Sequence, residues 1–182
     1  MILGLDISTS ITGVSIVDRN NELIYCEAWR TDKSKLSFFE KLDIIKDKIC
    51  YINSQYPIES IFVEEPLGMF AAGRSSAQVI SKIQRFNGVV CWMLREVFGM
   101  DPIYINASTA RKKYGIKIRR GQKAKEIVLQ HVLKNEKSFK MEYNRNNNPA
   151  KGVYDKADSL VIARAGHYLI KEEAKKGNKY EN

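Results

Sequence analysis

The chain has 182 residues, of which 44% are hydrophobic, and this is enough for one domain with a substantial core. Thirty lysines and arginines against 21 acidic residues give a net charge of +9, which favours a polyanionic partner over an acidic or neutral one. Three widely spaced cysteines exclude a disulfide framework, and no hydrophobic run approaches the ~20 residues of a membrane span. We therefore expect a cytoplasmic protein with no membrane partner.

The first third of the chain is typical of three short strands followed by a helix. Residues 2–7 and 12–18 are apolar and β-branched, and residues 22–29 form a third strand-like run after a turn at 19–21. Consecutive strands joined by tight turns predict an antiparallel meander. Apolar residues spaced three and four apart then predict a helix over 36–53.

The rest of the chain alternates strands with helices. A strand at 60–64, a helix at about 75–98 and a strand at 102–106 indicate a parallel crossover. We expect an α/β fold in which a five-stranded mixed sheet, three antiparallel strands followed by two parallel ones, is flanked by helices in three layers. Residues 1–175 should form this single domain and residues 176–182 a polar tail. Further helices are predicted at 109–114, 122–133 and 154–175.

Acidic residues stand where these elements begin and end. Asp6 interrupts an apolar first strand, where its carboxylate must lose hydration unless a partner compensates it. Glu64 and Glu65 close the fourth strand, and period-two alternation allows only one of them to share a face with Asp6. Asp155 and Asp158 are three apart at the start of the last helix and project from one side of it.

Each of these acids alone is typical of a solvated strand end or of an acidic first helical turn. Together they can converge above one edge of the sheet. Carboxylate oxygens are preferred ligands of Mg²⁺, and two ions ~4 Å apart can support in-line displacement at a phosphodiester. The sequence therefore predicts metal-dependent chemistry on a phosphodiester.

Five segments occur in a specific order within residues 1–170, namely GLDIST, GVSIVD, FVEEP, FNGVVCWMLRE and DKADSLVIA. In this order and spacing they resemble the RuvC-type Holliday junction resolvases of the RNase H-like superfamily, including phage-encoded relatives. The resemblance implies an RNase H-like fold and an endonuclease that resolves four-way and other branched DNA junctions. It also implies a homodimer, because a four-way junction offers two equivalent strands, and a location in the cytoplasm, or the host's if the chain is phage-encoded.

The resemblance also assigns roles to residues. Glu64 takes the family position, whereas Glu65 immediately precedes a proline, where the strand must leave the ladder. Two Mg²⁺ ions, for which Mn²⁺ would substitute, are implied on four carboxylates that we expect to be both catalytic and metal-binding: Asp6, Glu64, Asp155 and Asp158.

Basic and aromatic residues complete the predicted site. The family's two basic positions correspond to Arg111 and Lys123, with Lys125 as a competitor for the second. In the relatives an aromatic residue in the loop after the fourth strand stacks on junction bases, and Phe70 is the candidate here although this loop is longer. The full set of expected DNA-binding residues is Phe70, Arg74, Arg111, Lys112, Arg119, Arg120, Lys123 and Lys125.

The helix predicted over 75–98 carries apolar residues beyond one stripe, which would suit either a dimer interface or the monomer core: Phe86, Val90, Trp92 and Leu94. Other functions stay open. The first strand pair also resembles the phosphate-binding entry of sugar kinases and actin-like ATPases, which require two such domains. A RuvC-like RNA-processing nuclease and a non-catalytic RNase H-like nucleic-acid-binding protein are further alternatives.

Overall fold

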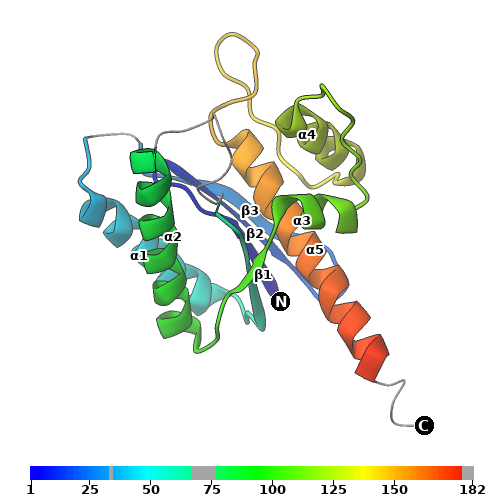
Figure 1. Cartoon of the computed structure of the whole chain (residues 1–182), viewed down its shortest axis with the longest axis horizontal. Helices are drawn as coiled ribbons and strands as arrows, with labels where there is room; N and C mark the ends of the chain where they lie inside the picture. The colour runs from blue at the N-terminus through cyan, green and yellow to red at the C-terminus, as the bar shows by residue number, and fades with distance from the viewer. Residues whose placement is uncertain (33–34, 67–76, 178–182) are drawn as a thin grey trace.

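The computed structural model of the chain describes residues 1–32, 35–66 and 77–177. Five strands form one sheet in the order β3-β2-β1-β4-β5, antiparallel from β3 to β1 and parallel from β1 to β5 (Figure 1). This confirms the predicted mixed sheet. The elements are β1 (Ile2–Asp6), β2 (Ile11–Val17), β3 (Leu23–Arg30), α1 (Phe38–Gln55), β4 (Ser60–Glu64), α2 (Ala77–Phe98), β5 (Ile103–Ile105), α3 (Ala107–Lys113), α4 (Ala124–Asn135) and α5 (Val153–Gly177).

Helices cover both faces of the sheet, so the molecule has three layers (Figure 1). Leu3 and Leu5 of β1 pack into a core shared with α1 and α2. On the other face Ile2 of β1 and Phe62 of β4 pack into a second core shared with α3, α4 and α5. The alternation of side chains along β1 and β4 therefore decides which residues meet α5.

Helix α5 crosses the sheet at very short range. A Cβ atom on Gly4 would lie 2.5 Å from the backbone nitrogen of Ala163, and one on Gly166 would lie 2.3 Å from the ring of Phe62. Only glycine at these two positions allows the helix to lie so near the strands without a shift. Glycine at these two positions therefore sets how closely α5 packs against the sheet.

The helix ends differ modestly from those predicted. Helix α1 begins at Phe38, two residues later than its apolar periodicity indicated, because Ser37 caps it: the Ser37 hydroxyl accepts from the backbone N–H of Glu40, and the Glu40 carboxylate accepts from that of Ser37. Helix α5 continues to Gly177. No helix in the described parts of the chain is long and apolar enough to cross a membrane.

Helix α2 turns most of its apolar residues into the core. Phe86, Val90 and Leu94 are fully buried against the sheet, whereas Trp92 is 59% exposed. The burial alternative therefore holds for three of the four residues considered for a dimer interface. Trp92 alone remains available to a second molecule.

A buried ion pair fixes α4 against α5. The Arg164 guanidinium on α5 donates to the Glu136 carboxylate at the end of α4 over 2.5 Å, and both side chains are 7% exposed. The hydroxyl of Tyr114, which follows α3, donates to the second Glu136 oxygen over 2.5 Å. The Glu136 carboxylate thus links the residue after α3, the end of α4 and the middle of α5.

Candidate active site

Two of the predicted carboxylates end adjacent parallel strands. The register of β1 and β4 pairs Leu5 with Val63, the residues directly before Asp6 and Glu64. Because both preceding residues point into the core under α1 and α2, Asp6 and Glu64 belong to the face that α5 covers. Glu65 is exposed. The structure therefore brings Glu64, rather than Glu65, to Asp6.

The other two carboxylates reach the same place through the start of α5. Gly13 of β2 lies opposite Asp6, and a Cβ on Gly13 would lie 1.9 Å from the backbone oxygen of Asp155. Next along β2, on the same face, the Ser15 hydroxyl is 2.8 Å from that of Ser159 on α5. The first turn of α5 therefore rests directly on the sheet beside Asp6. Gly13 was not among the predicted site residues, although a glycine inside a strand often marks close backbone approach.

Burial and mutual repulsion act on these carboxylates together. Burial raises the pKa of Asp6 well above its usual range, and the charges of Glu64, Asp158 and Asp155 raise it further. Burial, followed by the charge of Asp158, raises the pKa of Glu64 to about 7. The pKa of Asp158 rises to about 6, mainly through burial, with Asp155 adding to the effect. The four side chains thus form one electrostatic cluster.

Two cationic side chains oppose this cluster. The ammonium of Lys125, in the first turn of α4, lies 4.0 Å from a carboxylate oxygen of Asp155. Lys125 and Arg111 both lower the pKa of Glu64 and of Asp158. Lys123 instead contacts Glu126 at 3.0 Å. Of the two lysines considered at this position, Lys125 is therefore the one at the acidic cluster.

The donor set fits hard divalent cations such as Mg²⁺ and Mn²⁺, which prefer carboxylate oxygens. Four acids against two bases leave an excess of negative charge when all are ionised, and burial makes that charge unfavourable without a cation. Within residues 1–32, 35–66 and 77–177, no three acidic, histidine or cysteine side chains are gathered closely enough to chelate one ion. Metal binding would have to draw the carboxylates closer together.

Two adjacent hollows open at the acidic cluster, and Glu64 lines both. One, of about 290 Å³, is also lined by Asp6, Asp155 and Lys125. The other, of about 670 Å³, lies towards β5 and α3 and is also lined by Arg111. An anionic chain lying across these hollows would meet a cationic side chain on each side of the carboxylates.

The other predicted contact residues spread outwards from this centre. Arg111 is half-buried beside the carboxylates. Phe70 and Arg74 lie outside the described residues. The remaining basic residues of the set are exposed on α3, on the link between α3 and α4, and at the start of α4: Lys112, Arg119, Arg120, Lys123 and Lys125.

No protein-family model and no curated protein sequence matches the chain. Solved structures do match it. The T. thermophilus RuvC in complex with a Holliday junction substrate superposes with a TM-score of 0.68 at 16% identity over 94% of each chain. A second structure of Thermus thermophilus RuvC gives 0.62 at 17% identity, over 94% of this chain and 96% of that one.

The crystal structure of the yeast mitochondrial Holliday junction resolvase, Ydc2, gives a TM-score of 0.64 at 11% identity, over 97% of this chain and 81% of that one. Three matches along almost the whole chain, at low identity, show a common fold. The chain therefore has the fold of the RuvC-type resolvases, as the sequence segments predicted.

Proposed function

We propose that the chain is a metal-dependent endonuclease that resolves four-way DNA junctions and cuts other branched DNA. One observation carries the proposal: Asp6, Glu64, Asp155 and Asp158, from three separate elements, form one electrostatic cluster with Arg111 and Lys125 at its rim. A fold shared with two Holliday junction resolvases supports the choice of substrate. The basic net charge of +9 agrees with a nucleic-acid partner.

In this proposal the four carboxylates hold two Mg²⁺ ions, which when bound supply an activated water and stabilise the leaving oxygen. Arg111 and Lys125 bind the phosphates that flank the scissile bond and orient that bond over the carboxylates. Asp158 is buried and Asp6 is partly buried, so the carboxylates are less hydrated than surface groups and the charge interactions among them are stronger. The exposed basic residues beyond the cluster supply affinity for the backbone without contacting the reacting atoms.

We further propose that the chain acts as a homodimer. A four-way junction presents two equivalent strands, and a two-fold symmetric pair of chains would present two sites to them. Trp92, which is 59% exposed, is a large apolar side chain of α2 that stays outside the core and is more exposed than Val79 on the same helix. Sedimentation of the wild type and of Trp92→Ala would test whether this side chain supports association.

Cleavage of end-labelled substrates tests the proposed function. Four-way, three-way, flap and linear DNA, together with a structured RNA, should be incubated with the wild type with and without Mg²⁺. We expect symmetric cuts in the four-way junction that require the metal. Preferential cutting of the RNA would favour an RNA-processing nuclease instead.

Asp6→Asn should abolish cleavage and leave junction binding largely intact, because the carboxylates serve the chemistry and the basic surface supplies the affinity. Asp43→Asn is the matched control, since Asp43 is exposed on α1 on the opposite face of the sheet. Cleavage by Asp6→Asn at the wild-type rate would contradict the assignment. Binding without cleavage by the wild type would leave a non-catalytic binding protein as the better description.

A further inference from the structure

A loop between α4 and α5 projects beyond the end of the sheet at which α5 begins, drawn in yellow-orange in Figure 1. It closes on itself like a small hairpin, because Tyr143 and Pro149 form an antiparallel bridge. The backbone N–H of Asn144 donates to the carbonyl of Asn148 over 2.9 Å. The side-chain oxygen of Asn144 accepts from the N–H groups of Asn146 and Asn148 over 2.9 and 3.1 Å. We name residues 143–149 the projecting loop.

The base of the projecting loop is fastened to the body of the protein. The N–H of Ala150 donates to the carbonyl of Glu142 over 2.8 Å, which closes the neck. Lys156, buried in α5, donates to the carbonyl of Lys140 over 3.0 Å and to the Glu142 carboxylate over 2.8 Å. Lys151 pairs with Asp32 on the opposite side. The projecting loop is thus held in one orientation, so little ordering entropy would be lost when it binds.

Its exposed surface is aromatic, amidic and cationic. Tyr143 is 60% exposed, and Arg145 stands exposed near the tip. Residues 143–151 contain Arg145 and Lys151 and no acid. Exposed aromatic rings stack on bases or sugars, and arginine and asparagine donate to phosphate oxygens and base edges. Charge and side-chain chemistry therefore match nucleic acid.

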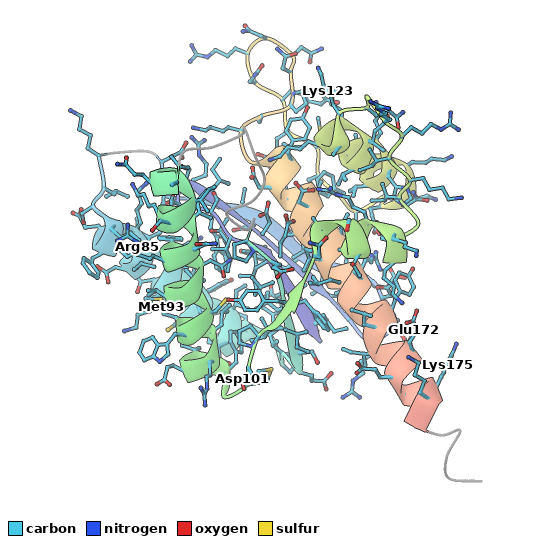
Figure 2. All side chains as sticks on the ribbon, in the orientation of Figure 1. Arg85, Met93, Asp101, Lys123, Glu172 and Lys175 are labelled. Carbon is cyan, nitrogen blue, oxygen red and sulfur yellow. The ribbon has the colours of Figure 1, made fainter. Side chains whose placement is uncertain are left out.

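The projecting loop also lies at the end of the molecule that holds the acidic cluster. Asp155 lies in the first turn of α5, which begins four residues after Pro149. The contact of Lys125 with Asp155 brings the start of α4 to the same end of the molecule, where Lys123 is labelled in Figure 2. DNA bound over the carboxylates would therefore pass between the basic start of α4 and the projecting loop.

We infer that the projecting loop is a further DNA-binding element, in which Arg145 contacts a backbone phosphate and Tyr143 packs on a sugar or base of the arm that enters the site. This inference rests on the proposed function, since it takes DNA as the ligand. The Tyr143–Pro149 bridge and the Asn144 hydrogen bonds preorganise the loop, so Tyr143 and Arg145 are held in place before DNA binds. Asn144 is thus a positioning residue, because it acts through the shape of the loop.

Binding in a cleavage-deficient Asp6→Asn background tests the inference. Fluorescence anisotropy should measure the affinity for a labelled four-way junction across a series of salt concentrations. Tyr143→Ala/Arg145→Ala should weaken binding about tenfold and lower the slope of log K against log salt by about 0.9, the value of one phosphate contact. Tyr51→Ala/Lys46→Ala is the matched control. Both residues are exposed on α1, on the opposite face of the sheet, and Tyr51 is 52% exposed.

Asn144→Ala removes no charge and no ring, so a loss of affinity of about threefold, with the slope unchanged, would support the positioning role. Affinities and slopes equal to the control for both loop variants would overturn the inference. If the wild type cuts junctions while the loop variants behave like the control, only the loop inference fails. If the wild type neither binds nor cuts any DNA, the proposed function fails with it.

Discussion

Replacing one carboxylate of the acidic cluster should make the metal-free protein more stable while removing its activity. Asp158 is 6% exposed, and burial is the main reason that its pKa rises from 3.8 to about 6. A raised pKa means that the folded protein holds this proton more tightly than the unfolded chain does. The resulting stabilisation is complete below pH ~4 and is lost as the pH rises through about 6. Above pH 7 the ionised group therefore opposes folding.

The size of the effect follows from the two pKa values. Each pKa unit corresponds to 1.36 kcal/mol, so the difference between 3.8 and about 6 amounts to roughly 3 kcal/mol at pH 8. Asparagine has the same shape without the charge, but its buried amide costs about 1 kcal/mol if it lacks a partner. We expect Asp158→Asn to gain about 2 kcal/mol. For a domain of this length the melting temperature should rise by about 4 to 8 °C.

Thermal melts in EDTA between pH 4 and 8 test this reasoning. The gain from Asp158→Asn should be greatest at pH 8, should disappear between pH 4 and 5, and should become a loss of up to about 1 kcal/mol at lower pH. Glu65→Gln, which alters an exposed neighbour of the site, should change stability by no more than about 0.5 kcal/mol at any pH. Addition of Mg²⁺ should stabilise the wild type more than Asp158→Asn. A variant that melts at or below the wild-type temperature at pH 8, with a parallel pH profile, would refute a destabilising carboxylate.

Four further outcomes are expected. Glu64→Gln should abolish cleavage at saturating Mg²⁺ with unchanged circular dichroism, whereas Glu65→Gln should retain most of it; the reverse result would place the strand register off by one. Gly13→Ala should slow single-turnover cleavage about 100-fold with junction affinity retained, because the new methyl displaces Asp155. Lys125→Ala should lower kcat at least tenfold more than Lys123→Ala, since only Lys125 contacts the acidic cluster; equal effects would contradict this. Glu136→Ala should lower the free energy of unfolding in urea by about 3 to 5 kcal/mol, because it leaves the buried Arg164 charge without a partner. Lys137→Ala, at an exposed neighbour, should leave it almost unchanged.

Much of the fold was predictable because its determinants are local. Short apolar runs mark β1 and β4, which are buried on both faces, and apolar spacings of three and four mark the helices. Period-two alternation allows only one of Glu64 and Glu65 to share a face with Asp6, and the family resemblance together with Pro66 favours Glu64. Spacing along α5 likewise puts Asp155 and Asp158 on one side of that helix. These statements need no knowledge of distant contacts.

Other features were decided by packing between segments far apart in the chain. Ser15 and Ser159 are 144 residues apart in the chain and their hydroxyls form a hydrogen bond. This bond and the lack of a side chain at Gly13 set how closely the start of α5, with Asp155, packs against β2. The choice of Lys125 over Lys123 depends on how α4 is oriented against α5, and two basic residues in one helical turn look alike in sequence. Sequence patterns report what a residue does within its own element, because period and propensity are local. Which side chains meet across elements depends on close-packed tertiary contacts, and these decide the geometry of the candidate site.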